Sequence, residues 1–516
     1  MEREARGQLV RAIAIAAVLF AVAYVLPGVR HRLIAAVTSW DASPSEPARL
    51  PPADGPALSA APRVRVILID GLAAETARTL PAWSATCQRG VALTMDVGFP
   101  TVSLAVEAAL WSGLTQQQSG IVFRSDHPLE PPLAGIPAQV PNSIAIAEDH
   151  GYIVRSLGFA TALPAADPAD HARDADAATW KTTWQARATE AVASDARLVF
   201  VHLLRVDSAG HHFGRDSSEY RAIAGEADAI LGGLVATAPD ARWFLLSDHG
   251  HLAAGGHGGE ERDVRQVEAC VAGPGLEALV AAAGRSTATG PHARVPGPRV
   301  HVVDVARAIA DSVGAKLDRG SLARPLAGAV IAPLADDQAV PPRSRAALVL
   351  AIVIVVLGFA LGSWVTPRWW LQPWWFALAL LSFVIVRGPP TLSMPAIWGP
   401  TGRAMYVTWL PALAVAAAAT YVALGRTTLV RAVTGQLALP YATLAAALAV
   451  CGAWPVLVGA EVAPVVPTFT AWLSPLVLIA AHGSAAVALA VLGRSVRSAF
   501  GRPSPPETPR SAPAAS

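Results

Sequence analysis

The chain has 516 residues, of which 53% are hydrophobic and 15% charged. This composition is too apolar for a wholly soluble protein, so it predicts several membrane-spanning segments. The formal net charge is only +2 and the basic residues form no long cluster, which excludes nucleic acid as an expected partner.

The N-terminus predicts a membrane anchor over residues 1–30. A start with three arginines, residues 1–11, precedes an unbroken apolar run over residues 12–26. The tripeptide at 21–23, Ala-Val-Ala, also fits a signal-peptidase site, so a cleaved signal peptide is the alternative to an uncleaved anchor. Both alternatives place the following domain on the exported side. Residues 31–62, rich in Pro, Ala and Ser from 41 onward, predict an extended linker.

Residues 63–335 predict an exported domain of the α/β class. Apolar runs end abruptly at polar residues and indicate strands at 64–70, 198–204, 242–248 and 267–273. Helical patterns separate these strands, and residues 300–315 predict a short strand followed by a helix. The expected fold is a doubly wound, mostly parallel sheet.

Residues 336–493 predict an all-α transmembrane region. Five apolar runs each approach the length needed to cross a bilayer: 346–364, 370–386, 405–424, 437–459 and 470–492. Together with the anchor they form an even number of spans, which places both termini on one side. Arginines near the N-terminus, between spans and after the last span indicate that this side is the cytoplasm. Residues 494–516 predict a disordered tail.

Three predicted strands end at aspartates, and these ends meet at the edge where doubly wound sheets bind ligands. The aspartates are Asp70, Asp207 and Asp248. Three carboxylates at one edge repel one another unless cations neutralise them. Nearby histidines supply nitrogen donors suited to zinc or a similar divalent ion: His211, His249 and His257. The alternative for any single aspartate is a helix cap.

A candidate nucleophile lies in residues 99–114. Thr101 and Ser103 directly precede a predicted helix, whose N-terminal amides favour a phosphate. Ser103 or Thr101 is therefore expected to attack, with a neighbouring metal ion assisting ionisation of the hydroxyl. The alternative is a structural helix cap with Glu107 in the first turns.

These motifs together resemble the alkaline-phosphatase superfamily. They are Asp70-Gly71, Pro100-Thr101-x-Ser103, Asp207-Ser-Ala-Gly-His211, Ser247-Asp248-His249-Gly250 and Gly256-His257-Gly258-Gly259. Within the superfamily the motifs resemble the type I phosphodiesterase/nucleotide pyrophosphatase branch, and the domain order is similar to that of the glycolipid-anchor ethanolamine phosphate transferases. The resemblance covers roughly residues 63–335.

The resemblance implies two divalent metal ions, usually zinc, and a covalent phospho-serine intermediate. One ion is expected on Asp207, His211 and His257, and the other on Asp70, Asp248 and His249. Ser103 is the implied nucleophile, with Thr101 as the alternative. His212 and His251 are interpreted as solvent-facing residues or as residues behind the metal ligands.

Arg124 stands where the related phosphodiesterases carry an Asn, and its guanidinium is a candidate phosphate clamp; the alternative is a solvent-facing side chain. Cys87 and Cys270 are the pair available for a disulfide, because Cys451 lies in an apolar segment.

The motifs predict a membrane-bound, metal-dependent phosphodiesterase or phosphohydrolase. Hydrolysis and transfer to a second alcohol share every catalytic residue, so a phosphoethanolamine-type transferase acting on a lipid or glycolipid is the alternative. A third hypothesis is a transport or scaffold protein whose exported domain has lost catalysis. The expected partners are a phosphoester substrate, lipid-linked in the transferase alternative, and membrane lipid. Nothing in the sequence specifies the oligomeric state.

Overall fold

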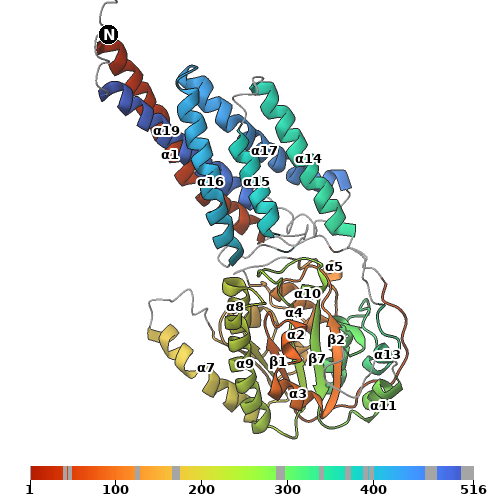
Figure 1. Cartoon of the computed structure of the whole chain (residues 1–516). Helices are drawn as coiled ribbons and strands as arrows, with labels where there is room; N and C mark the ends of the chain where they lie inside the picture. The colour runs from red at the N-terminus through yellow and green to blue at the C-terminus, as the bar shows by residue number, and fades with distance from the viewer. Residues whose placement is uncertain are drawn as a thin grey trace, which may run out of the picture.

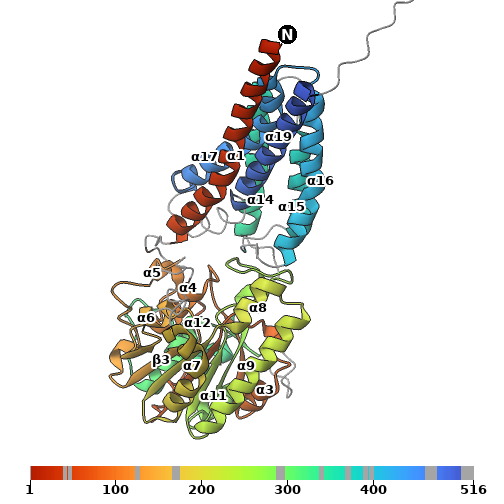
Figure 2. The same cartoon turned by 90° about the vertical axis from the view of Figure 1, so that its left-hand side faces the viewer.

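The computed structural model describes residues 2–38, 44, 49–122, 128–165, 175–285, 297–335, 342–366, 373–387, 393, 400–458 and 473–500. These residues form an α/β domain and a bundle of apolar helices (Figure 1). The bundle lies against one end of the α/β domain in both views (Figures 1 and 2).

The α/β domain is built on an eight-stranded sheet with the order β4-β3-β5-β1-β6-β7-β2-β8. The strand bounds are β1 Val64–Ile69, β2 Gly90–Asp96, β3 Ser143–Ala147, β4 Thr161–Leu163, β5 Leu198–Leu203, β6 Arg242–Leu246, β7 Gln266–Ala272 and β8 Arg299–His301. Most neighbouring strands are parallel, whereas β7 runs antiparallel to both β2 and β6. The predicted α/β class with a mostly parallel sheet is confirmed.

Helices cover both faces of the sheet. Their bounds are α2 Ala74–Ala77, α3 Pro81–Cys87, α4 Ser103–Ser112, α5 Gln116–Ser119, α6 Tyr152–Ser156, α7 Ala175–Ala193, α8 Arg205–Phe213, α9 Ser218–Thr237, α10 Arg262–Arg265, α11 Glu277–Arg285, α12 Val302–Val313 and α13 Leu326–Ile331, with a 3₁₀ turn at Pro137–Gln139. The predicted strand and helix at 300–315 correspond to β8 and α12.

The side chains of β1 show how one strand serves two cores. Val64, Val66 and Leu68 belong to the cluster on the face covered by α4, α6, α11 and α12. Ile67 and Ile69 belong to the cluster on the opposite face, covered by α3, α7 and α9. Every residue of β1 is buried, and apart from Arg65 all of them are apolar, as is typical of a strand covered on both faces.

Two further features fasten the domain. A disulfide joins Cys87 at the end of α3 to Cys270 in β7, the pair that the sequence left available. The second half of the predicted linker packs on the domain: Leu58 and Ala61 are buried, and the Ala61 amide donates to the carbonyl of Ser312. Residues 49–62 therefore lie on the domain surface, whereas residues 31–38 continue the first helix of the chain.

The bundle comprises α1 Glu2–Thr38, α14 Pro342–Val365, α15 Trp374–Arg387, α16 Pro400–Ala423, α17 Leu429–Val458 and α19 Ser474–Phe500. Four segments of the described chain are long and apolar enough to cross a membrane: Arg6–Leu33, Leu348–Val365, Leu429–Ala453 and Ser474–Ala499. The apolar stretches Trp374–Val386 and Val407–Ala423 are shorter. Helix α1 begins and α19 ends at the end of the bundle that lies away from the α/β domain (Figures 1 and 2).

Candidate metal and phosphoester site

The end of β1 supplies the first carboxylate. Asp70 directly follows the strand and is fully buried. Gly71 turns the chain with φ of 69°, and a Cβ there would lie 2.7 Å from the Cα of Asp207, so the two segments meet only because residue 71 is glycine. The Tyr220 hydroxyl donates to the Gly71 carbonyl at 2.7 Å and fixes this turn. The helix-cap alternative for Asp70 is wrong, because α2 begins after Ala73 without a side-chain cap.

Helix α8 follows β5 and carries the next two predicted ligands. Asp207 and His211 are four residues apart and therefore share one helical face, with 3.4 Å between Asp207 Oδ1 and His211 Nε2. A Cβ on Gly210 would lie 2.3 Å from the ring of His251, so this glycine makes room for that histidine.

The end of β6 and the glycine-rich segment after it supply the remaining ligands. Asp248 and His249 are fully buried, and His257 returns so that its ring stacks on His249 with 3.7 Å between centroids. The Nδ1 atoms of these histidines lie 3.1 Å from the Gly250 carbonyl and 2.8 Å from the Thr101 carbonyl, respectively. Since a carbonyl only accepts, Nδ1 carries the proton in both rings and each Nε2 keeps a lone pair for a metal ion.

The two candidate nucleophiles occupy different environments. Ser103 is the first residue of α4, and its Oγ lies 3.3 Å from His249 Nε2. Thr101 is fully buried, and its hydroxyl donates to the Gly259 carbonyl and accepts from the Gly258 amide, each at 2.9 Å. The structural-cap alternative is wrong, because Val102 is the N-cap residue of α4 and no side chain caps the helix. The Ser103 hydroxyl thus contacts a predicted ligand, whereas the Thr101 hydroxyl binds the backbone of the glycine-rich segment.

The six predicted ligands lie in two adjoining groups. Ligand atoms of Asp70, Asp248 and His249 all lie within 4.8 Å of one another. In the other group, Asp207 Oδ1 lies 3.4 Å from His211 Nε2 and 3.6 Å from His257 Nε2, and the two histidine nitrogens lie 3.1 Å apart. The structure therefore brings together every residue of both sets expected from the sequence.

The donor atoms fit a pair of divalent cations. Both carboxylate oxygens of Asp70 and Oδ2 of Asp248 are buried and have no hydrogen-bond partner among the described residues. Buried carboxylates that lack such partners are strongly destabilising unless a positive charge compensates them. Mixed carboxylate and imidazole donors suit zinc or a similar ion.

Burial and mutual repulsion perturb these groups. Burial raises the pKa of Asp70 well above its usual value, with the charges of Asp248 and Asp207 adding to the shift. Burial likewise raises the pKa of Asp248 to about 6. It lowers the pKa of His249 to about 3 and that of His257 well below its usual value. The histidines are thus neutral at physiological pH, as metal ligation requires.

Asp207 behaves in the opposite way. Burial opposes its ionisation, but the surrounding histidines, His211 foremost, hold the pKa of Asp207 well below its usual value. His251 Nε2 donates to Asp207 Oδ1 at 2.9 Å, and its Nδ1 accepts from the Gly256 amide at 3.1 Å. His251 is fully buried and orients Asp207 from behind. Of the two interpretations made from the sequence, this agrees with a residue behind the metal ligands. His212 is exposed.

Two residues near the site were missed as functional candidates. His202 in β5 and Glu107 in α4 are fully buried beside Asp70. Glu107 is four residues after Ser103 and hence on the same helical face, a signal that the sequence did offer. Arg124, the candidate phosphate clamp, lies outside the described residues.

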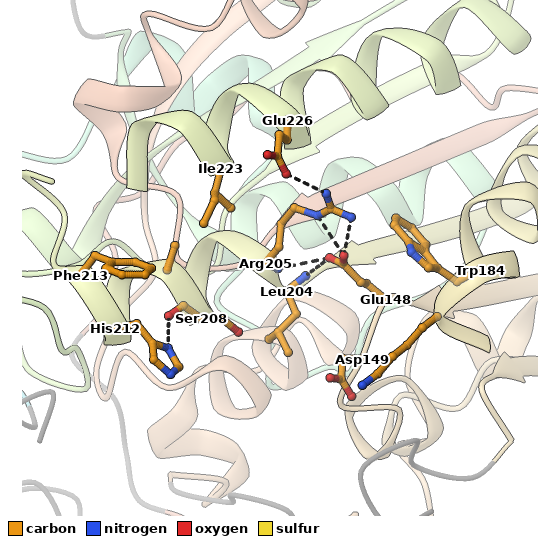
Figure 3. Close-up of a pocket in the computed structure, with 12 residues that line it drawn as sticks. Glu148, Asp149, Trp184, Leu204, Arg205, Ser208, His212, Phe213, Ile223 and Glu226 are labelled. Atoms are coloured by element: carbon orange, nitrogen blue, oxygen red, sulfur yellow. Dashed lines mark hydrogen bonds and ion pairs between the residues drawn. The ribbon is translucent and has the colours of Figure 1, made fainter. Parts of the chain in front are cut away.

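A cavity of about 570 Å³ lies on the other side of α8 (Figure 3). Three of its charged groups pair with one another: Arg205 contacts Glu148 at 2.6 Å and Glu226 at 3.3 Å. Neither Ser103 nor any of the six predicted ligands lines this cavity, so it is separate from the metal and phosphoester site.

Residues 145–311 match the family model "Type I phosphodiesterase / nucleotide pyrophosphatase". This match confirms the resemblance that the motifs indicated, and it supports a phosphoester-cleaving enzyme. Among curated proteins, none matches the sequence significantly.

One solved structure with a similar arrangement is murine ectonucleotide pyrophosphatase/phosphodiesterase 5. The two sequences are 18% identical, the match covers 36% of this chain and 57% of that chain, and the TM-score is 0.28. A 2-O GAG sulfatase has 13% identity over 55% of this chain and 76% of its own, with a TM-score of 0.36. Phosphonoacetate hydrolase from Sinorhizobium meliloti is 14% identical, the match covers 38% of this chain and 57% of that chain, and the TM-score is 0.27. Scores this low carry no argument about activity.

Proposed function

We propose that this chain, a relative of the type I phosphodiesterases and nucleotide pyrophosphatases of the alkaline-phosphatase superfamily, is a membrane-bound, metal-dependent phosphodiesterase or phosphohydrolase. The observation that carries the proposal is the position of Ser103 Oγ, 3.3 Å from His249 Nε2 and beside two groups of metal-ligand atoms. A hydroxyl at a helix N-terminus, next to ligands for two cations, is suited to attack on a phosphoester.

In the proposed reaction, Ser103 Oγ forms a bond with phosphorus while the ester oxygen departs from the opposite side. The products are a phosphoserine and a free alcohol, and water then cleaves the phosphoserine. Two divalent ions on the predicted ligand sets, when bound, would favour the ionised hydroxyl and offset the phosphate charge. The amides at the start of α4 would favour a phosphate bound beside Ser103. The Thr101 hydroxyl binds the Gly258 amide and the Gly259 carbonyl.

Membrane attachment and an exported domain are part of the proposal. Four long apolar helices support the attachment. The α/β domain lies at the end of the bundle opposite to the start of α1 and the end of α19, so termini in the cytoplasm would place the domain outside (Figure 2). The disulfide between Cys87 and Cys270 is typical of an oxidising compartment and supports the same side.

One contact favours a substrate at the membrane surface. Ser393, which follows α15, donates through its amide to Glu261 and accepts through Oγ from the Gly259 amide at 3.2 Å. The same Gly259 accepts the Thr101 hydroxyl through its carbonyl. The membrane region therefore reaches the segment beside the candidate nucleophile. This contact supports the alternative function, a phosphoethanolamine-type transferase acting on a lipid or glycolipid.

The test is release of nitrophenol from a phosphodiester and a phosphomonoester by the detergent-purified full chain. We expect turnover that chelator removes, that zinc restores, and that Ser103→Ala lacks. The matched control is Ser208→Ala, on the face of α8 that lines the separate cavity. Turnover equal in Ser103→Ala and wild type would overturn the proposed nucleophile.

A folded, zinc-loaded protein that releases no nitrophenol would favour transfer over hydrolysis. Headgroup transfer from phosphatidylethanolamine in mixed micelles to a diacylglycerol whose acyl chains differ from those of the donor would then be measured by mass spectrometry with the same two variants. Failure of both reactions would leave the scaffold hypothesis, against which the complete set of predicted ligands argues.

A further inference from the structure

A second cavity, of about 320 Å³, lies between the helices α2 and α10 and the strands β2 and β7 (Figure 1). Three arginines line it, namely Arg78, Arg215 and Arg262, so we call it the arginine cavity. Neither Ser103 nor any of the six predicted ligands belongs to its lining. The reaction proposed above therefore gives the arginine cavity no role.

Two buried residues of the lining carry polar atoms without a partner. Thr94 in β2 is 5% exposed and Gln266 in β7 is 6% exposed. Because residues 94 and 96 pair with residues 268 and 266, Thr94 and Gln266 are diagonal neighbours on one face of the sheet. Among the described residues, neither Thr94 Oγ1 nor Gln266 Nε2 has a hydrogen-bond partner. Buried donors of this kind require an acceptor.

Arg262 leaves the amide nitrogen of Gln266 as the group in need of a partner. Its Nε donates to Gln266 Oε1 at 3.1 Å, so the amide oxygen is already satisfied. The nitrogen at the other end of the amide is a donor only. The Thr94 hydroxyl can also donate. An acceptor opposite these two groups must therefore come from water or from a ligand.

Two arginines add charged donors to the same cavity. Arg78 follows α2 and donates through Nε and Nη2 to one oxygen of Glu268. Arg215 follows α8 and contacts Asp216 at 3.1 Å and Asp263 at 2.8 Å. A guanidinium has five N–H donors, so these contacts use only part of each group.

The acidic residues of the lining lie at its exposed rim. Glu75 is exposed, and the side chain of Asp263 is 51% exposed, whereas that of Arg215 is only 13% exposed. Solvent and salt screen exposed charges more effectively than buried ones. The buried part of the lining therefore offers donors and positive charge, an environment that suits an oxyanion.

We propose that the arginine cavity binds a phosphate group, either as free phosphate or as the headgroup of a phosphomonoester lipid. A tetrahedral oxyanion presents acceptors in several directions, which suits donors that come from two strands and two separate arginines. The competing explanation is a cavity filled with water alone. The inference uses neither the metal ligands nor Ser103, so it goes beyond the proposed function and stands apart from it.

Phosphate binding by the metal-free protein tests the arginine cavity separately from the metal site. The full chain in detergent is stripped with chelator, and binding of radiolabelled phosphate is measured by equilibrium dialysis at low ionic strength. We expect one bound phosphate per chain, held about tenfold or more weakly by Thr94→Val and by Arg215→Gln. Thr94→Val should fold like the wild type, because the hydroxyl that it removes has no partner among the described residues.

The matched control for the loss of charge is Arg187→Gln. Arg187 pairs with Glu190 on the surface of α7, so this variant removes one positive charge outside the cavity and should bind phosphate like the wild type. Equal weakening by Arg187→Gln and Arg215→Gln would overturn the proposal, because the effect would then be one of net charge.

Three other results would also overturn it: no binding to the metal-free protein, binding only after zinc is added, or unchanged binding in both Thr94→Val and Arg215→Gln. Competition identifies the source of the phosphate group. Displacement by dihexanoylphosphatidic acid at a lower concentration than by unlabelled phosphate supports a lipid headgroup, and the reverse order supports free phosphate. A protein that binds phosphate without metal but lacks turnover with zinc would contradict the proposed function and leave this inference intact.

Discussion

Replacement of Thr101 by valine separates the roles of the two candidate nucleophiles. Valine keeps the shape of threonine and removes the hydroxyl, which donates to the Gly259 carbonyl and accepts from the Gly258 amide. Both backbone groups lie in a fully buried environment. Leaving one buried polar group unpaired costs about 1–3 kcal/mol, so the two together destabilise this segment by roughly 2–6 kcal/mol.

Ser103→Ala should have the reverse profile. Among the described residues, the Ser103 hydroxyl has one side-chain hydrogen-bond contact, with His249 Nε2 at 3.3 Å. Loss of this hydroxyl should therefore change stability by less than about 1 kcal/mol. Removal of a nucleophile typically lowers kcat by about 10⁴-fold or more. We therefore expect Thr101→Val to melt several degrees lower and keep a measurable rate, and Ser103→Ala to melt like wild type without turnover.

The assay combines thermal unfolding of the zinc-loaded protein with mass-spectrometric detection of the phosphorylated residue after acid quench. Phosphate on Ser103 in both wild type and Thr101→Val is expected. Phosphate on residue 101, or a Thr101→Val protein that melts like wild type yet lacks turnover, would refute the reasoning and make Thr101 the nucleophile.

Three further outcomes are expected. Burial raises the pKa of Asp248 to about 6 and that of Asp70 well above its usual value, so the metal-free site holds more protons at about pH 6 than at about pH 8. Zinc binding should therefore release more protons at about pH 6 than at about pH 8. Calorimetry in buffers of different ionisation enthalpy measures this difference, and equal release at both pH values would contradict it. His251→Phe removes the donor to Asp207 and should weaken zinc binding about 10–100-fold in competition with a chelating dye, whereas unchanged affinity would exclude an orienting role. The double variant Cys87→Ala/Cys270→Ala removes a disulfide between residues 183 positions apart in the sequence and should lose about 2–5 kcal/mol of stability. A wild-type melting temperature that does not change with reductant would show that the disulfide does not form.

The strand ends were predictable from sequence because burial on both faces leaves a simple pattern. In β1 and β6 an apolar run stops at an aspartate, and in a mostly parallel sheet such ends lie at one edge. The direction of β7 could not be predicted in this way, because a buried strand has the same residue pattern whether it runs parallel or antiparallel. Strands β2, β3 and β4 were missed. Strand β4 has three residues, and β2 and β3 are rich in small and polar residues that interrupt the apolar run.

The missed side chains depend on contacts between distant segments. His251 has a defined role only because Gly210 leaves space for its ring, and no local pattern connects these positions. Glu107 was interpreted as part of a helix start, yet it faces His202 across the core. Here the sequence did contain a signal, since a histidine within the buried strand β5 requires a polar partner.

The contact of Ser393 with the glycine-rich segment would give the membrane an influence on the proposed reaction. Ser393 lies between α15 and α16 and contacts Gly259, whose carbonyl binds the Thr101 hydroxyl. Apolar helices adapt to bilayers of different thickness by tilting. A change in the tilt of α15 or α16 would therefore displace Gly259 relative to Ser103. In vesicles we expect the rate to vary with lipid acyl-chain length, and Ser393→Ala to weaken that dependence.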